Sequence, residues 1–297
     1  MRLRPALAAL LLPVALLAGC GDDGDDGDDA APDGTEETTE ATDAADGSDP
    51  SEETTASSAV AEDPVLSIVV TNDDGYDAAG IDAVVEALVA EGHEVEVVAP
   101  LEQQSGTGGT YTEGAVESQE VQTASGHDAL AVDGFPSDSV RVALDELELT
   151  PDLVVSGINE GQNVGGLVDV SGTIGAARAA VARGVPALAL SAALGPVENG
   201  YEVGAELMVG WIDENAEALL AGEAPVEVTS INIPSCPDGQ EVEDLVEVPV
   251  ATEGEFLAAS DCASELTDPA DDTEALNNGF PTLTVVPAEP ATPPQPG

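Results

Sequence analysis

The 297-residue chain contains no lysine and only five arginines, against 60 acidic residues, so its formal net charge is −55. Such a chain repels backbone phosphates, which excludes nucleic acid duplexes as partners. A small anionic substrate would need a local positive centre, and with so few basic side chains a bound metal ion is the obvious source. The acidic surface also suits a salt-rich setting, in which the repulsion is screened.

Cysteine and histidine are also scarce, with three and two residues. Cys236 and Cys262 form an even pair, which in an exported protein favours one disulfide over two separate buried thiols. His93 and His127 have no partner His or Cys at metal-ligand spacing, so we assign neither to a metal.

The first twenty residues have the composition of a targeting segment. Two arginines give it a charged start, and its apolar stretch, residues 6–17, is too short to span a bilayer stably. It ends in Leu-Ala-Gly-Cys, which resembles the lipobox of bacterial lipoproteins; the alternative is an ordinary signal peptide with an incidental cysteine. We expect residues 1–19 to be a signal peptide, and the exported protein to be anchored by a lipid on Cys20 to the outer face of the plasma membrane.

Residues 20–63 are rich in Asp, Glu, Thr, Ala, Ser and Gly and contain almost nothing apolar. Such a segment cannot bury enough surface to offset its conformational entropy, so we expect a disordered acidic linker. Its Asp-Asp-Gly repeats do not have the spacing of a calcium loop. The Pro-rich end, residues 287–297, is also expected to be disordered.

Residues 64–286 alternate strand and helix patterns, which predicts an α/β fold, a Rossmann-like three-layer sandwich with a mostly parallel sheet. The expected strands are residues 68–70, 94–99, 151–155, 186–191, 226–233 and 283–286, with a β-hairpin within 111–133. The expected helices are residues 81–88, 137–147, 171–184 and 203–220. In the second of these helices we expect Ser137 or Asp138 near the N-terminal cap, with Val140, Ala143, Leu144 and Leu147 facing inward.

Two adjacent carboxylates, Asp73 and Asp74, follow the first buried strand. Their charges repel and both lose water on burial, a cost that a bound cation removes. Asp-Asp-Gly also forms ordinary turns, so this motif alone leaves both interpretations open. Ser105, Asn159 and the helix start at residues 171–173 come after further core strands, and such loops meet in one crevice of a parallel sheet. Together they predict an all-oxygen cation site beside an anion seat.

Six segments, in this order, resemble the SurE family of metal-dependent 5′/3′-nucleotidases, also described as survival-protein acid phosphatases. They are IVVTNDDGYDAAGI, VVAPLEQQSGTG, GFPSDSVRVAL, PDLVVSGINEGQNVG, SGTIGAARAAVARGVPALALS and DDTEALNNGFPTLTVVP. By this resemblance, the metal ligands are Asp73, Asp74, Ser105 and Asn159. The implied substrate or phosphate contacts are Asn72, Gly106, Thr107, Asn163, Ser171, Gly172 and Thr173. The resemblance further implies one divalent cation, Mg²⁺ or Mn²⁺, and a homodimer or homotetramer that exchanges C-terminal elements.

The resemblance implies hydrolysis of nucleoside 5′- or 3′-monophosphates, or other small phosphomonoesters, with Asp73 and Asp74 as the catalytic residues. We expect a metal-activated water to attack phosphorus, and we place an aspartyl-phosphate on Asp73 second. A non-catalytic nucleotide-binding surface lipoprotein is the alternative function. An aspartate-nucleophile phosphatase of another fold would need Asp-x-Asp spacing, whereas these two aspartates are adjacent. No residue identifies itself as the general acid.

Overall fold

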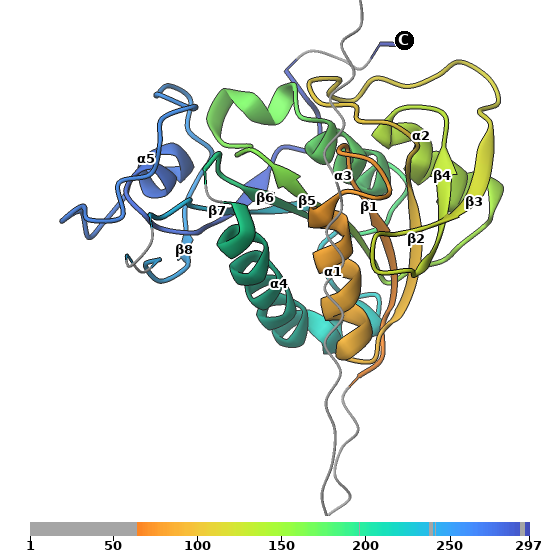
Figure 1. Cartoon of the computed structure of the whole chain (residues 1–297), viewed down its shortest axis with the longest axis horizontal. Helices are drawn as coiled ribbons and strands as arrows, with labels where there is room; N and C mark the ends of the chain where they lie inside the picture. Colours follow the sequence, from red (N-terminus) through yellow and green to blue (C-terminus); the bar gives the residue numbers. More distant parts are fainter. Residues whose placement is uncertain (1–63, 196, 238–239, 241, 292–294) are drawn as a thin grey trace, which may run out of the picture. The chain divides into compact units, whose positions relative to one another are not determined.

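The structure, a computed structural model, describes residues 64–297 except 196, 238–239, 241 and 292–294. The expected signal peptide, Cys20 and the acidic linker lie outside the described residues. Within the described part the chain forms a nine-stranded sheet in the order β3-β4-β2-β1-β5-β6-β7-β9-β8 (Figure 1). The strands are β1 (Ser67–Thr71), β2 (Glu94–Pro100), β3 (Ser118–Gln122), β4 (Asp128–Val132), β5 (Leu153–Glu160), β6 (Ala187–Ala192), β7 (Val228–Ile233), β8 (Val246–Glu247) and β9 (Thr282–Val286).

The six strands from β4 to β7 in this order are parallel. The expected hairpin is the antiparallel pair β3–β4, and β4 also pairs with β2, so the hairpin extends the main sheet. At the other edge β9 runs antiparallel to β7, and β8 runs parallel to β9. The prediction of an α/β fold with a mostly parallel sheet is confirmed.

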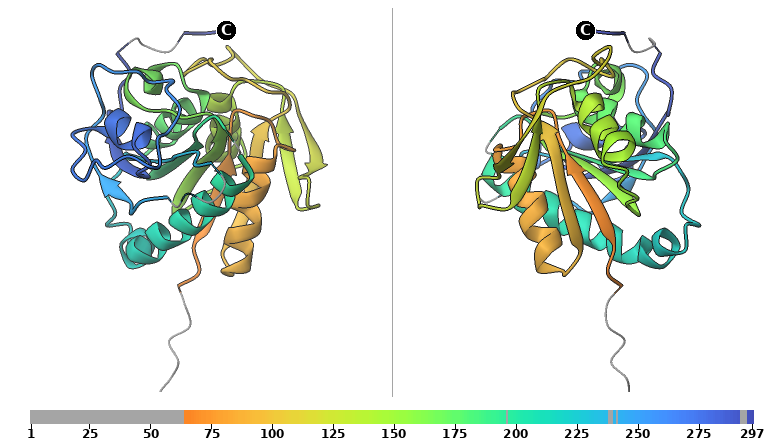
Figure 2. Two further views of the ribbon diagram at one scale, coloured as in Figure 1. Left: turned by 60° about the vertical axis from the view of Figure 1, so that its left-hand side comes forward. Right: turned by 90° about the vertical axis from the view of Figure 1, so that its right-hand side faces the viewer.

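Helices cover both faces of the sheet (Figures 1 and 2). The helices are α1 (Ala79–Ala90), α2 (Pro136–Arg141), α3 (Gly172–Val181), α4 (Val197–Leu220) and α5 (Asp272–Asn277), with a π-helix η1 (Val142–Glu146) and a 3-10 helix η2 (Gly165–Asp169). In β1, Ile68 and Val70 belong to the apolar cluster under α1 and α4, whereas Val69 belongs to the cluster under α2 and α3. This alternation explains why a parallel core strand is apolar throughout. No helix in the described part combines a bilayer-spanning length with a sufficiently apolar sequence.

The helix expected at residues 137–147 differs from the prediction in two ways, its widening into a π-helix and the exposure of Leu147. Ser137 and Asp138 lie near the cap as expected: the N-cap is Phe135, Pro136 occupies the first helical position, and the Asp138 carboxylate accepts the Phe135 N–H at 3.0 Å. Asp138 is therefore the third helical residue. The helix then widens into η1, and Leu147, expected to face inward, is 49% exposed at its end.

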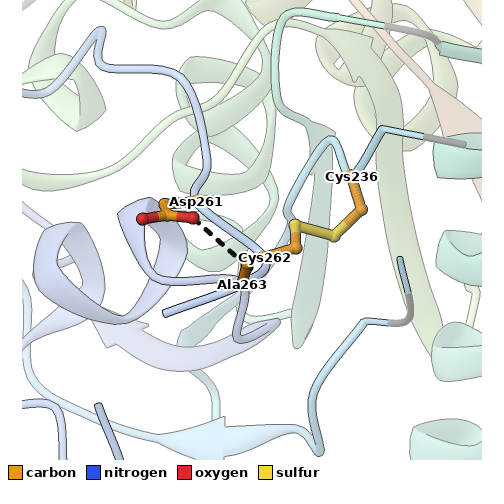
Figure 3. Close-up of a disulfide and its surroundings, with 4 residues drawn as sticks. All are labelled: Cys236, Asp261, Cys262 and Ala263. Atoms are coloured by element: carbon orange, nitrogen blue, oxygen red, sulfur yellow. Dashed lines mark hydrogen bonds between the residues drawn. A yellow bond between two sulfur atoms is a disulfide. The ribbon is translucent and has the colours of Figure 1, made fainter. Parts of the chain in front are cut away.

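The region after β7 contains elements that the sequence did not predict, namely β8 and α5. Both are short, with two and six residues, so neither has a hydrophobic period to recognise. A disulfide joins Cys236 to Cys262 across this region with a Cα–Cα distance of 5.6 Å (Figure 3). Beside it the Asp261 carboxylate accepts the Ala263 N–H at 3.2 Å (Figure 3).

The described residues of the C-terminal segment contact the domain, which the expectation of disorder did not include. Arg178 Nε donates to the Pro287 carbonyl at 2.9 Å. The Ala291 N–H donates to Asp169 at 3.1 Å. Farther on, the Gly297 N–H donates to the Tyr111 carbonyl at 2.9 Å. These contacts lay the segment beside η2 and the loop after β2.

Candidate functional site

The candidate site lies where the strand order reverses. The chain moves from β1 outward to β2 and β4, then returns to β5 on the other side of β1. In open parallel sheets such a reversal leaves a crevice at the carboxyl ends of the strands, and ligands bind there. Asp73 and Asp74 follow β1 directly, so they stand at this crevice.

Asn72 supports the loop that carries the two carboxylates. It is fully buried, its Nδ2 donates to the Gly75 carbonyl at 2.7 Å, and its Oδ1 accepts the Gly75 N–H at 3.2 Å. Gly75 has φ +104°, which a residue with a Cβ rarely adopts. Asn72, predicted from the resemblance as a substrate contact, therefore lies beneath the loop and fixes its shape.

Asp73 faces the N-terminus of α3 and is only 2% exposed. The Thr173 hydroxyl donates to Asp73 Oδ1 at 2.6 Å. A Cβ on Gly172 would lie 2.8 Å from Asp73 Oδ2, so only glycine lets the helix approach this closely. Burial raises the pKa of Asp73, opposed by hydrogen bonds from the Thr173 hydroxyl and the Gly172 and Thr173 N–H groups. The first turn of α3 thus directs its donors at this carboxylate.

A network of buried side-chain amides and hydroxyls contacts Thr173. Asn163 Nδ2 donates to Ser191 Oγ at 2.8 Å and, more weakly, to Thr173 Oγ1 at 3.4 Å. Asn232 Oδ1 accepts the Asn163 N–H at 2.7 Å. Asn163 is predicted from the resemblance as a substrate contact, whereas Asn232 is not among the predicted site residues. The available signal was an asparagine near the carboxyl end of the buried strand β7, where Asn159 stands in β5.

Asp74 is fixed by β5. Its Oδ2 accepts the Glu160 N–H at 3.0 Å. Burial raises its pKa to about 6, and the charges of Asp73 and Glu160 act in the same direction, while the Glu160 N–H opposes them. The two carboxylates therefore accept hydrogen bonds from different elements, Asp73 from α3 and Asp74 from β5.

Asn159 does not lie in a loop, as the sequence predicted, but inside β5. The pairing of β5 with β6 shifts register between Ser156 and Asn159, and this irregularity brings the side chain to the strand tip. Asn159 Nδ2 donates to the Gly161 carbonyl at 2.6 Å. Asn159 Oδ1 is buried and accepts no hydrogen bond from the described residues. A buried acceptor left in this state costs about 1–3 kcal/mol.

The loop after β2 lies against the Asp73 backbone. The Gln104 N–H donates to the Asp73 carbonyl at 2.7 Å, and the Thr107 hydroxyl donates to the Gln104 carbonyl at 2.7 Å. Ser105 is exposed between them, and its Oγ accepts from Gln103 Nε2 at 2.5 Å. Gly106 follows in an exposed turn with φ +78°. Ser105 and Gly106 thus stand on the loop beside the carboxylates, and Thr107 braces it.

The helix expected to begin at residues 171–173 does so, and Ser171 is the N-cap of α3. Its Oγ accepts the Ile174 N–H at 3.1 Å. The hydroxyl proton takes no part in that bond, so it is available to a ligand. The helix start therefore offers backbone N–H groups and one hydroxyl proton.

The side-chain oxygen atoms of this site fit a cation that is bound by oxygen ligands. The described part of the chain contains no group of three or more His, Cys, Asp and Glu side chains that would hold a metal. Asp73 and Asp74 would supply the charge, and Asn159 and Ser105 would supply neutral oxygens, the ligands that Mg²⁺ and Mn²⁺ prefer. The unpartnered Asn159 Oδ1 is the feature that this arrangement explains best.

The model of the survival protein SurE family matches residues 68–254. The chain is 42% identical over 179 residues to the 5′-nucleotidase SurE of Brevibacillus brevis, covering 58% of this chain and 68% of that protein. It is 38% identical over 176 residues to the 5′-nucleotidase SurE of Parasynechococcus marenigrum, covering 58% of this chain and 64% of that protein.

The fold leads to the same family. A crystal structure of the SurE protein from Aquifex aeolicus superimposes with a TM-score of 0.60 at 26% identity, covering 75% of this chain and 94% of that one. The family model spans the strands and loops that build the crevice, from β1 through β7. The chain belongs to the SurE family.

Proposed function

We propose that the protein is a divalent-cation-dependent phosphomonoesterase that converts nucleoside 5′-monophosphates to nucleoside and phosphate. The relatives that are named 5′-nucleotidases support this activity. The observation that carries the proposal is the buried, unpartnered Asn159 Oδ1, on the residue just before Glu160, whose N–H binds Asp74. A binding protein without chemistry has no need to place a second carboxylate against a first one at such a cost.

The chain's own residues would divide the work. Asp73, Asp74, Ser105 and Asn159 would hold the cation, which when bound polarises phosphoryl oxygens and lowers the pKa of water. The first amides of α3 and the Ser171 hydroxyl proton would receive the charge that develops on the phosphoryl group. Thr173, whose hydroxyl is bonded to Asp73, would keep that carboxylate oriented toward the cation. Activity toward 3′-monophosphates and simple acid-phosphatase substrates belongs to the same proposal.

A matched pair of variants tests the assignment. Nucleoside 5′- and 3′-monophosphates and p-nitrophenyl phosphate would be assayed for phosphate release with Mn²⁺ or Mg²⁺ and with chelator. We expect chelator to abolish turnover, and Asn159→Leu to weaken metal affinity or activity by on the order of 10–100-fold. Asp77→Asn, an exposed aspartate of the same loop, is the control and should keep full activity. Nucleotide binding without metal-dependent phosphate release would support the non-catalytic alternative instead.

We propose in addition that the protein is exported and anchored to the outer face of the plasma membrane through Cys20. The supporting observation is the Leu-Ala-Gly-Cys ending of an apolar N-terminal stretch. Cys20→Ser should release the protein from the membrane fraction of expressing cells, and unchanged fractionation would refute the anchor. We also propose a homodimer or homotetramer, which light scattering at several concentrations would test.

A further inference from the structure

The three arginines of the described chain line one cavity. They are Arg141 at the end of α2, Arg178 in α3 and Arg183 just after α3, and the cavity measures about 440 Å³. No acidic side chain is among its lining residues. In a chain with 60 acidic residues and no lysine, every arginine of the described part therefore borders this one cavity. The candidate catalytic site uses none of these side chains.

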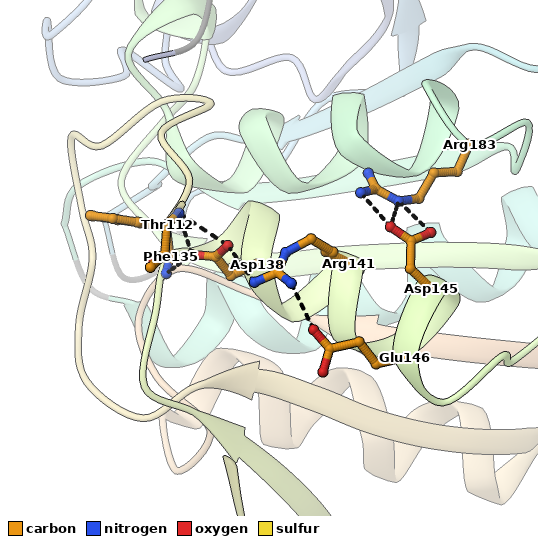
Figure 4. A network of polar contacts seen from close by, with 7 residues as sticks. All are labelled: Thr112, Phe135, Asp138, Arg141, Asp145, Glu146 and Arg183. Carbon is orange, nitrogen blue, oxygen red and sulfur yellow. Dashed lines mark hydrogen bonds and ion pairs between the residues drawn. The ribbon is translucent and has the colours of Figure 1, made fainter. Parts of the chain in front are cut away.

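Each arginine has a carboxylate partner that stands outside the cavity lining. Arg183 forms a two-pronged pair with Asp145 at 2.8–3.0 Å, and Arg141 contacts Glu146 at 2.6 Å and Asp138 at 3.2 Å (Figure 4). A guanidinium has five N–H donors, so these partners occupy only part of each group. The Arg141 Nε is buried and has no partner in the described part of the chain. The carboxylates therefore fix the direction of the guanidinium groups and leave further donors available.

Arg178 is the most buried of the three, with 9% of its surface exposed. Its Nε donates to Pro287, its Nη1 to the Val168 carbonyl at 3.1 Å, and its Nη2 to Asp169 at 3.0 Å. Three of its five donors are thus held by protein, which leaves two for a ligand. A side chain so placed is preorganised, so ligand binding would cost little conformational entropy.

The rest of the lining is apolar or small. Ala179 and Ala182 come from α3, Pro290 from the C-terminal segment, and Tyr111, 39% exposed, from the loop after β2. We propose that this cavity is a second anion-binding site, which takes a small organic phosphate. The guanidinium groups bind the phosphate, and the organic part packs against Tyr111, Ala179 and Ala182.

This site is separate from the crevice that holds Asp73. Gly175, on the first turn of α3, contributes to the cavity, and the loop after β2 presses on it there. A Cβ on Gly175 would lie 2.0 Å from the Gly108 carbonyl oxygen. The loop after β2 therefore packs directly against α3 at Gly175, with no space for a side chain there. None of the proposed cation ligands, Asp73, Asp74, Ser105 and Asn159, lines the cavity, so a ligand bound there does not need the cation.

Side-chain NMR of arginine gives a direct test, because the full chain has only five arginine Nε–H signals. The full-length protein would be titrated in chelator with inorganic phosphate and with phenyl phosphate. We expect the signals of Arg141, Arg178 and Arg183 to shift and saturate, whereas any signal from the two arginines of the expected signal peptide, where it is retained, should stay in place. Phenyl phosphate should bind more tightly than inorganic phosphate, because only it reaches the apolar lining.

Two variants complete the test. Arg141→Gln and Arg183→Gln should each weaken binding by on the order of 10-fold. Both should leave the cation-dependent phosphatase activity unchanged. Arg183 is a surface residue, so its variant is expected to fold even where Arg141→Gln does not. The proposal is overturned if the arginine signals of the parent do not move, if the shifts fail to saturate, if Arg183→Gln binds as tightly as the parent, or if inorganic phosphate binds as tightly as phenyl phosphate.

Discussion

Replacing Asp74 by Asn should stabilise the protein in the absence of metal. Burial raises the pKa of Asp74 from 3.8 to about 6, so the folded state binds this proton more tightly than the unfolded state does. That contribution is complete below pH 3.8 and is lost as the pH rises through about 6. At pH 7.5 the folded protein therefore carries an unfavourable charge that Asn removes, while the Asn oxygen still accepts the Glu160 N–H.

The size of the effect follows from the shift. About two pKa units correspond to ~3 kcal/mol, and solvent screening of this partly exposed carboxylate lowers the figure to ~1–2 kcal/mol. We expect Asp74→Asn to raise the free energy of unfolding by that amount at pH 7.5 in chelator. The difference between variant and parent should disappear near pH 3.8. A cation at 100 times its dissociation constant adds ~2.7 kcal/mol to the parent, so saturating Mn²⁺ should reverse the order of the two proteins.

Urea denaturation at pH 4, 5.5 and 7.5, with chelator and with Mn²⁺, measures all of these quantities. Asp77→Asn is the control for the general repulsion in so acidic a chain, and its effect is subtracted. A variant that is less stable than its parent in chelator at pH 7.5 would refute the reasoning. So would a difference that does not change with pH, or one that metal leaves unaltered.

Three further predictions concern the framework of the domain. Gly175→Ala should lower the free energy of unfolding by more than ~2 kcal/mol, because its Cβ would meet the Gly108 carbonyl. Gly210 in α4 has open space around it, so Gly210→Ala should raise the free energy of unfolding by ~0.5–1 kcal/mol. Thermal denaturation of both variants measures the two effects. Cys262→Ser opens a loop of 26 residues and should lower the free energy of unfolding by ~3.5 kcal/mol. The melting temperature should fall accordingly, and reductant should lower the melting temperature of the parent but not that of the variant. Asp138→Ala removes the common acceptor of the Thr112 N–H, the Phe135 N–H and the Arg141 guanidinium. We expect urea denaturation to show a free energy of unfolding that is lower by ~3–5 kcal/mol. A loss below ~1 kcal/mol would contradict this role.

The sequence predicted the sheet well, because its core strands are short apolar runs bounded by polar loops. Residues 68–70 lie within β1, and residues 153–155 of the expected strand 151–155 form the start of β5. The meeting of Asp73 with the start of α3 also follows from chain order alone, since loops at the carboxyl ends of parallel strands share an edge. The sequence motifs therefore contain most of the information needed to place the crevice.

Other details depend on packing that no local pattern records. Asn159 stands inside a strand because β5 shifts register against β6, which is a property of the pair. Asn72 was expected to touch substrate, but its amide is used beneath the loop. The cap at Phe135 is different, because proline at the first position of a helix is a readable signal that would have refined the expectation of Ser137 or Asp138 near the cap.

The direction of β1 has a consequence for access. The described chain enters the domain at Pro64, three residues before the amino end of β1, and Asp73 lies past its carboxyl end. The entry of the described chain and the Asp73 carboxylate are therefore at opposite ends of β1. If Cys20 holds the protein to a bilayer as proposed, the attachment leaves the mouth open to solutes that diffuse in from outside the cell, and shortening the linker should not obstruct their entry.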